Sequence, residues 1–149
     1  MSKRSLQMRS RLLLILLCTF SCLAAEKPNT RAIKLNLAAL EFARQLIKEG
    51  RAVPDRKGAW RGDKPSTAQE NEFIRAHGFN EYGKWHLGID NRHSAGSKAH
   101  YKFPFGDFNS LHRCGLLAVK ARAHEYGYGD IEAAADQLLV EIQINRPIR

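Results

Sequence analysis

The 149-residue chain is long enough for one domain around one hydrophobic core, which excludes a multidomain organisation. Its formal net charge is +9, but four of its basic residues precede an apolar run near the N-terminus with no acid to offset them: Lys3, Arg4, Arg9 and Arg11. Without them, 20 of the 24 basic residues face 15 acidic ones, a charge of +5. A surplus of this size suits an anionic ligand or surface but is common in proteins without one, so charge selects no partner.

Residues 1–25 have the composition of a secretory signal peptide. A basic segment ends at Arg11, an apolar run covers residues 12–20, and small residues lead to Ala24 and Ala25. The apolar run is shorter than the ~20 residues of a membrane-spanning helix, so we expect no permanent membrane span. We predict cleavage after Ala24 or Ala25 and export to the periplasm or the extracellular space. The alternative is an uncleaved leader on a cytoplasmic or membrane-tethered protein.

Cysteine usage limits how the mature domain is held together. Cys18 and Cys22 leave with the predicted leader, so Cys114 remains alone and an internal disulfide is excluded. The domain must therefore be stabilised by its core, unless Cys114 pairs with another chain. In an apolar helical context we interpret Cys114 as a small core residue rather than a nucleophile.

Residues 26–65 are predicted to form an N-terminal helix followed by a loop. The helix covers residues 30–49, with Thr30 as a possible cap, and Gly50 is placed to end it. Its apolar residues fall on two faces, which indicates deep packing or contact with a second chain. Residues 51–66 are rich in Pro and Gly and form the loop, from which we expect Trp60 to fold back as an anchor.

Residues 66–145 are predicted to form the main helical domain. A capping box of Thr67 and Glu70 begins a helix that Gly78 ends. A second short helix covers residues 81–87, and the i, i+3, i+4 spacing places three of its residues on one face: Tyr82, Trp85 and His86.

The remaining elements complete an all-α prediction. Asp107 is a good N-cap for a helix over residues 108–126, and a final helix covers residues 131–144. The apolar stripe of this last helix is Ile131, Ala134, Ala135, Leu138, Leu139 and Ile142. Residues 103–105 are too short to make a sheet, and no stretch alternates with a sustained period of two. We therefore predict a single compact domain of four to five helices after the signal peptide.

Three short motifs resemble a group of small, mostly bacterial proteins with no assigned activity. The chain reads WHLG at residues 85–88, FGDF at 105–108 and HRCG at 112–115. The group has the pattern WHLG, then YGDF or FGDF, then HRxG. The resemblance covers about residues 70–140. It implies a shared one-domain fold and lends no catalytic residues.

A metal site is one possible use of the histidines. Five residues are of ligand type: His86, Asp90, His93, His100 and His112. His86 and Asp90 also have the i, i+4 spacing of a helix, although Gly88 interrupts it. The chain has no HExxH, no paired CxxC and no acidic cluster. These features favour structural or capping histidines, so we predict no metal and no cofactor.

Catalysis and nucleic-acid binding are two further functions that the residues would permit. A histidine titrates near neutral pH, so His86 or His112 with an aspartate could act in general acid–base catalysis of a hydrolase type. Whether the protein is an enzyme is left open. The solvent face of the 108–126 helix is basic, which would suit nucleic acid in a protein that is not exported. An ordinary solvated face explains it better, so we do not expect a nucleic-acid partner.

The main hypothesis is a binding module for a small ligand or a protein partner. The 108–126 helix places His112 on its apolar side and Arg113 toward solvent, while Arg122 falls on the apolar side and must snorkel or pair with a carboxylate. Glycines would let this helix and the 81–87 helix approach around a small cleft, although the same residues could equally fill the core. The candidate ligand-binding residues are Tyr82, Trp85, His86, Asp90, Asp107, His112 and Arg113.

Overall fold

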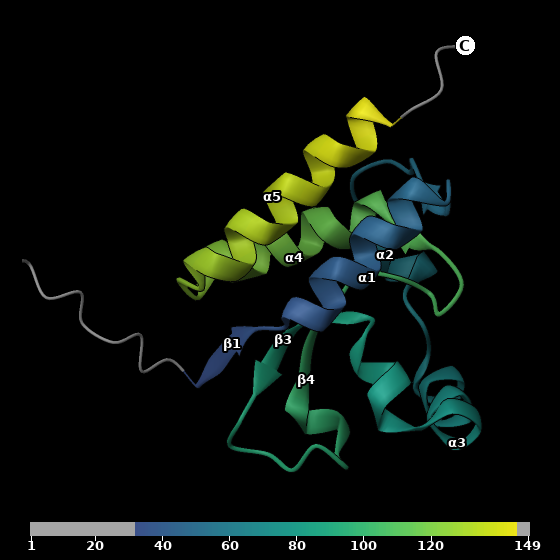
Figure 1. The fold of residues 1–149 in the computed structure, drawn as a ribbon, viewed down its shortest axis with the longest axis vertical. Coiled ribbons are helices and arrows are strands. Elements are labelled where there is room, and N and C mark those ends of the chain that lie inside the picture. The colour runs from purple at the N-terminus through teal and green to yellow at the C-terminus, as the bar shows by residue number, and fades with distance from the viewer. Residues whose placement is uncertain (1–31, 146–149) are drawn as a thin grey trace, which may run out of the picture.

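Residues 32–145 form helices and two small sheets in the computed structural model of the chain (Figure 1). The elements are β1 (Ile33–Leu35), α1 (Leu37–Lys48), β2 (Ala52–Val53), α2 (Trp60–Asp63), α3 (Thr67–Gly83), β3 (His86–Asp90), the 3-10 turn η1 (Lys98–His100), β4 (Tyr101–Pro104), β5 (Leu111–His112), α4 (Arg113–Glu125) and α5 (Gly129–Ile144). The fold is therefore α/β, and the all-α prediction is wrong. The predicted signal peptide, residues 1–25, lies outside the described residues.

The larger sheet is antiparallel, with β3 between β1 and β4. Ile33 of β1 lies opposite Asp90 of β3, and Leu35 lies opposite Gly88. On its other edge, β3 aligns Gly88 with Lys102 of β4. The glycine is needed at this crowded point, because a Cβ added to it would lie 2.7 Å from the Phe103 ring.

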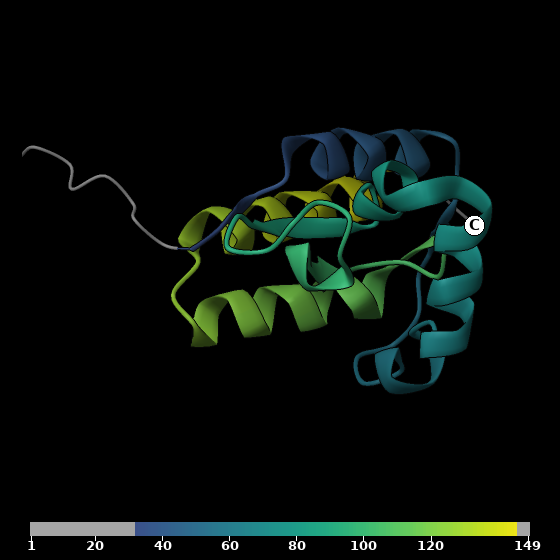
Figure 2. The same ribbon diagram turned by 90° about the horizontal axis from the view of Figure 1, so that it is seen from below.

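Strand β3 begins at His86 and Leu87, the last two residues of the predicted 81–87 helix. α3 ends at Gly83 and His86 begins β3, so Tyr82 and His86 do not share a helix. Figure 2 shows α1 on one side of the three-stranded sheet and α4 on the other. Each residue of β3 is buried or half-buried. A strand covered on both faces shows no alternation of apolar and polar residues, which is why the prediction missed it.

The smaller sheet joins two segments that are far apart in the sequence. β2 and β5 pair in parallel, with Ala52 opposite Leu111 and Val53 opposite His112. The predicted 51–66 loop is thus anchored at its start by this pair. It also contains the four-residue helix α2, which begins at the half-buried Trp60.

Helix α4 begins five residues later than predicted. Asp107 does not cap it; its Oδ1 accepts hydrogen bonds from the backbone N–H groups of Asn109 at 2.9 Å and Ser110 at 2.6 Å, which closes a turn. Phe108 has a φ of 70°, which an α-helix excludes. The C-terminal end of α4 agrees with the prediction, since Gly127 follows the helix with a φ of 71°.

The first helix is also shorter than predicted. α1 starts after Asn36, whose side chain accepts from the backbone N–H of Ala39. The Asn36 amide donates to the carbonyl oxygens of Gly83 at 2.9 Å and His86 at 3.0 Å. One N-cap residue therefore fixes α1 and also ties it to the start of β3.

Helix α3 has the predicted capping box one residue earlier in the chain. Ser66 and Gln69 form it, in place of Thr67 and Glu70. Gly78, with a φ of 79°, interrupts the helix where the sequence predicts its end. The chain then resumes a helical path to Gly83.

The core lies where α5 packs against α4 and α1. All six residues of the predicted apolar stripe of α5 are buried, which confirms that part of the prediction. Residues 33–53 pair with residues 86–112 in both sheets, so the N-terminal segment is part of the same core as the rest. No helix within residues 32–145 is long and apolar enough to cross a membrane.

Candidate functional site

The residues predicted to line one cleft lie in different parts of the structure. Trp85 is buried, and its ring lies 5.0 Å from that of Phe42 in an edge-to-face arrangement. It also packs near Phe105 and Phe108, with ring centroids at 6.1 and 6.0 Å. Trp85 is therefore held among aromatic core residues, while the ring contact of His112 is with Trp60, at 6.0 Å.

Tyr82 and His86 form a second group, which adjoins that of Trp85 because Tyr82 also packs against Phe108, at 5.8 Å. Their rings are 4.3 Å apart, and His86 Nδ1 lies 2.9 Å from the carbonyl oxygen of Tyr82, to which it donates. Burial outweighs this hydrogen bond and lowers the pKa of His86 from 6.5 to about 4. His86 is therefore neutral at physiological pH.

We expect His86 to make the protein less stable in mild acid. The unfolded chain binds the proton at a pKa near 6.5 and the folded one only near 4, so stability is full above pH 6.5 and declines between these values. The loss amounts to roughly 3 kcal/mol by pH 4. Urea unfolding at pH 7 and pH 4 should show this decline in the wild type and a much smaller one in His86→Asn, whose amide can still donate to Tyr82. The exposed His77→Asn is the control, and equal declines in all three proteins would contradict the expectation.

Asp90 lies in a third group at the end of β3. Its carboxylate accepts hydrogen bonds from Arg92 Nε at 2.9 Å and Nη2 at 2.8 Å, which hold the pKa of Asp90 well below its usual range. His93 Nε2 is 3.8 Å from the same carboxylate, and His100 Nδ1 is 2.9 Å from the Asp90 carbonyl oxygen. Because a guanidinium already neutralises this carboxylate, this group at the end of β3 is better suited to fixing a loop than to holding a ligand.

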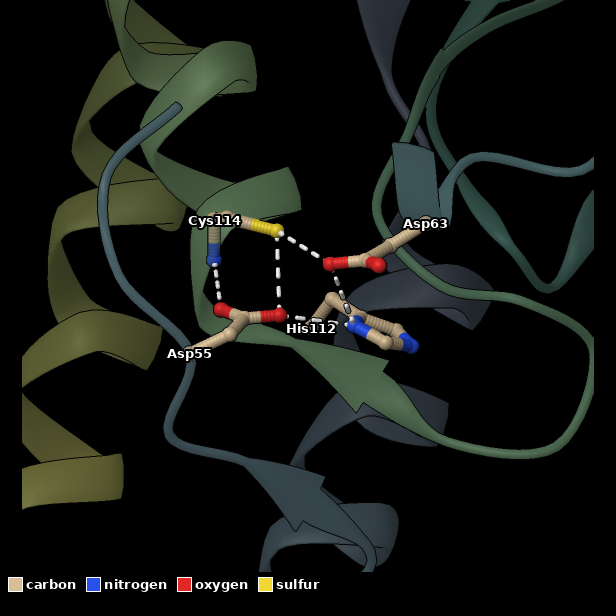
Figure 3. Close-up of side chains that lie close together, drawn as sticks. All are labelled: Asp55, Asp63, His112 and Cys114. Carbon is tan, nitrogen blue, oxygen red and sulfur yellow. Dashed lines mark hydrogen bonds and ion pairs between the residues drawn. The ribbon is translucent and has the colours of Figure 1, made fainter. Parts of the chain in front are cut away.

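Of the three remaining candidates, His112 belongs to a cluster of four side chains that could hold a metal ion. Asp55, Asp63, His112 and Cys114 point toward one another (Figure 3). One ligand atom from each residue lies within 4.8 Å of those of the other three. His112 and Cys114 are buried, and the two aspartates are half-buried.

The fold assembles this cluster from three places in the chain. Asp55 follows β2 and His112 ends β5, so the parallel pairing of these strands brings them together. Cys114 lies in the first turn of α4, one residue beyond Arg113. Asp63 is the last residue of α2, which contacts α4. Two short elements, β2 and α2, thus carry the two carboxylates to the N-terminus of α4.

Asp55 is the hub of the cluster. Its Oδ2 accepts hydrogen bonds from His112 Nδ1 at 2.7 Å and from the thiol of Cys114 at 3.0 Å. Its Oδ1 accepts from the backbone N–H of Cys114 at 2.6 Å, which satisfies a free donor of the first turn of α4. Arg113, expected to face solvent, is half-buried and donates to the Asp55 carbonyl oxygen at 3.3 Å.

Asp63 completes the cluster from the opposite side. Its Oδ2 lies 3.6 Å from Cys114 Sγ and 3.8 Å from His112 Nδ1. Its side chain is 36% exposed, against 12% for Asp55. The two carboxylates therefore approach the same imidazole and thiol, one from inside the protein and one from its surface.

Asp107 faces the other nitrogen of His112. Asp107 Oδ2 is 3.3 Å from His112 Nε2, but the geometry of a hydrogen bond is not met, and Nε2 stays buried without a hydrogen-bond partner. The contact between Asp107 and His112 is therefore electrostatic. The imidazole lies between the carboxylates of Asp55 and Asp107, as the sequence hypothesis of a histidine–aspartate pair requires.

The neighbouring carboxylates shift the pKa values of the imidazole and the thiol in the cluster. Burial works against a charged imidazole, but Asp55 and Asp107 outweigh it and raise the pKa of His112. Burial and the adjacent Asp55 and Asp63 raise the pKa of Cys114 far above its usual value. Burial also opposes ionisation of Asp55, yet the hydrogen bonds from Cys114 and His112 prevail and lower its pKa. At neutral pH the cluster thus contains a thiol, not a thiolate.

The donor set suits zinc better than calcium or magnesium. Carboxylate, imidazole and thiolate are the ligands that zinc binds, usually as four in a tetrahedron, whereas the alkaline-earth ions require oxygen ligands. Bond lengths of 2.0 to 2.3 Å give ligand–ligand edges of roughly 3.3 to 3.8 Å. The 3.6 Å from Asp63 Oδ2 to Cys114 Sγ already matches, and the 3.8 Å to His112 Nδ1 is slightly longer than an edge between oxygen and nitrogen ligands. Asp55 Oδ2, at 2.7 and 3.0 Å from its neighbours, would have to move outward slightly.

Sequence reasoning missed three of the four residues. It included His112 and the neighbouring Asp107 and Arg113, but it took Asp55 and Asp63 as loop charges and Cys114 as a core residue. No metal-binding spacing links them, because the contacts of Asp55 with His112 and Cys114 span 57 and 59 residues. The available signal was the adjacency of His112 and Cys114, two metal-ligand types two residues apart.

Comparisons with known proteins add no assignment. No family model, no curated protein and no solved structure matches the chain.

Proposed function

We propose that the protein binds a divalent transition-metal ion of the zinc type through Asp55, Asp63, His112 and Cys114. The observation that carries the proposal is the convergence of four different metal-ligand side chains on one point near the protein surface. This gives the binding module inferred from the sequence a definite ligand, and it replaces the prediction that no metal is bound.

Charge balance supports the proposal. At a pH below the raised pKa of His112, the cluster without metal holds two protons that a metal would displace, one on the Cys114 thiol and one on the His112 imidazolium. A divalent cation that replaces both protons leaves the total charge of the cluster unchanged. The buried surroundings therefore tolerate the exchange without a new uncompensated charge, and binding must release protons.

The hydrolase hypothesis has weaker support. It proposed His86 or His112 with an aspartate, yet His86 bonds to the Tyr82 backbone and the Nδ1–H of His112 is already bonded to Asp55. Nucleophilic attack by Cys114 is also disfavoured, because its raised pKa keeps the thiol protonated and its side chain is buried. The arrangement resembles a binding site more than a set of reacting groups.

The nucleic-acid hypothesis also has weaker support. Lys120 and His124, which made the face of α4 basic, lie 2.6 Å from Asp136 and 3.0 Å from Glu132 on α5. Arg122 pairs with the carboxylate of Glu125 at 3.0 Å and lies over the ring of Tyr126. Because acids accompany these cations, α4 does not present a continuous surface for phosphates.

Titration with cobalt tests the metal proposal. We expect Co²⁺ to bind and to produce the sulfur-to-metal charge-transfer absorption of a thiolate ligand, with visible bands typical of four-coordination. Zn²⁺ should displace it. Affinity should increase with pH, because His112 and Cys114 must lose protons. Asp63→Asn should weaken binding at least about tenfold, and Cys114→Ser should remove the charge-transfer band.

The control is Asp136→Asn, which removes an exposed carboxylate elsewhere on the surface. It should bind Co²⁺ like the wild type. The proposal is wrong if the wild type shows no charge-transfer band, or if Asp63→Asn and Asp136→Asn bind equally well.

A further inference from the structure

A cavity of about 680 Å³ lies beside the cluster, between α2, β4 and α4. Its size falls within the range of pockets that hold small molecules. The wall is largely apolar and aromatic, formed by Ile33, Phe103, Pro104, Val119, Tyr126 and Tyr128. Trp60, which packs against His112 on the cluster side, also lines it.

Every charged residue that lines the cavity is a cation: Arg61, Lys64, Lys102 and Arg122. Arg122 has Glu125 as an acidic partner. Within residues 32–145, the other three form no ion pair and no side-chain hydrogen bond. An apolar hollow bordered by several cations and lined by no acid is complementary to a molecule with an apolar body and an anionic end.

Phe103 at the wall adds a second, independent observation. Its φ is 62°, a conformation that costs a bulky residue on the order of 1 to 3 kcal/mol and that is found mainly at functional positions. Its ring packs at 5.8 Å from that of Tyr128, in an edge-to-face arrangement. The strained backbone thus positions an aromatic side chain in the wall of the cavity.

The lining also restricts the kind of apolar body. Apart from the cations, the side-chain polar groups of the lining are the Trp60 indole N–H and the hydroxyls of Tyr126 and Tyr128. A nucleoside or a sugar presents many donors and acceptors that these groups cannot satisfy. A hydrocarbon chain needs no such partners and gains from burial.

We propose that this cavity binds a single-chain amphiphile with an anionic head, such as a long-chain carboxylate or alkyl phosphate. The chain lies against the aromatic wall, and the head meets Arg61, Lys64 and Lys102. This site is separate from the metal cluster, and the proposal does not depend on a metal being bound.

Binding of dodecanoate to the protein, measured by calorimetry below the micelle concentration of dodecanoate, tests the proposal. Dodecanoate or dodecyl phosphate should bind, and the one that binds more tightly shows whether the cavity prefers a carboxylate or a phosphate head group. The cationic dodecyltrimethylammonium should bind at least about tenfold more weakly. Acetate, which lacks the chain, should not bind. Equal affinity for the anionic and cationic amphiphiles would overturn the proposal.

Two pairs of variants locate the site. Ala118→Leu fills the cavity and should abolish binding, whereas Ala121→Leu, on the exposed side of the same helix, should bind as the wild type does. Arg61→Ala combined with Lys64→Ala should weaken dodecanoate binding about tenfold, and the exposed Lys57→Ala should not. Circular dichroism confirms that each variant is folded. Unchanged binding by folded Ala118→Leu would place the amphiphile elsewhere and refute the assignment.

Discussion

Replacing Asp55 by alanine should reduce the free energy of unfolding by about 3 to 5 kcal/mol, as expected when one partner of a buried ion pair is removed. The His112 imidazolium would lose the acceptor of its Nδ1–H, and the backbone N–H of Cys114 would lose its bond to Oδ1. Both donors are buried, so water replaces the lost acceptor poorly. Urea unfolding of the metal-free protein measures the loss.

Asp63→Ala is the matched control for this prediction. It removes a carboxylate from the same cluster, but one that is more exposed and farther from the imidazole. Asp63→Ala should therefore cost less than about 1 kcal/mol in the metal-free protein, although both variants should lose metal binding. Equal losses of stability would show that Asp55 is not the hub of the cluster.

The effect of Asp55→Ala should also depend on pH. The lowered pKa of Asp55 stabilises the fold above its unfolded value near 3.8, and this contribution is lost as the pH falls. The raised pKa of His112 stabilises the fold below its unfolded value near 6.5, and this contribution is lost as the pH rises. The difference between wild type and variant should therefore be largest between these two values. A difference that is constant from pH 4 to pH 9 would contradict the ion pair.

Gly106→Ala should destabilise the protein by about 2 to 3 kcal/mol, the upper part of the range for overpacking. A Cβ at this position would lie 2.6 Å from the carbonyl oxygen of Ser110 and 2.6 Å from two ring carbons of Trp85. The backbone oxygen belongs to the turn that Asp107 closes, so it cannot swing away as a flexible side chain would. The thermal midpoint should fall accordingly.

Gly62→Ala is the control for the glycine prediction. An added Cβ there meets nothing within 4 Å, and alanine favours the helix in which Gly62 lies. Thermal unfolding of the two variants should differ clearly, with Gly62→Ala at or above the wild type. Similar midpoints for Gly106→Ala and the wild type would mean that the turn relaxes freely.

The helical parts of the fold were predictable because their signals are local. The stripe of α5 repeats with helical spacing over several turns, and Gly50 and Gly127 end their helices through a positive φ. The strands were not predictable in this way. They are two to five residues long, and the central one is covered on both faces, so neither length nor alternation reveals them.

The candidate site was predictable only in part. The inward position of His112 followed from the apolar residues around it, although it ends β5 rather than lying within a helix. Its partner Asp55 could not be identified, because a parallel pairing of two residues leaves no pattern in the sequence. Asp107 was taken as a helix cap, and it does accept backbone N–H groups, but those of a turn.

The three motifs of the proposed family resemblance meet in the structure. Phe105, in the FGDF motif, donates its backbone N–H to the carbonyl oxygen of Trp85 in WHLG. Gly115, in HRCG, approaches the Phe105 backbone so closely that an added Cβ would lie 2.8 Å from its oxygen. Packing at one junction thus accounts for the three motifs of this chain.

Helix α2 is common to the two proposed sites, and this has a thermodynamic consequence. Asp63 faces the metal cluster, while Trp60, Arg61 and the adjoining Lys64 line the cavity. A metal that held Asp63 would fix one end of this four-residue helix, and with it the positions of Arg61 and Lys64 beside the cavity. Linkage is reciprocal, so whatever factor the metal applied to amphiphile affinity, the amphiphile would apply to metal affinity. Occupancy of each site would then change the affinity of the other site through a single turn of helix.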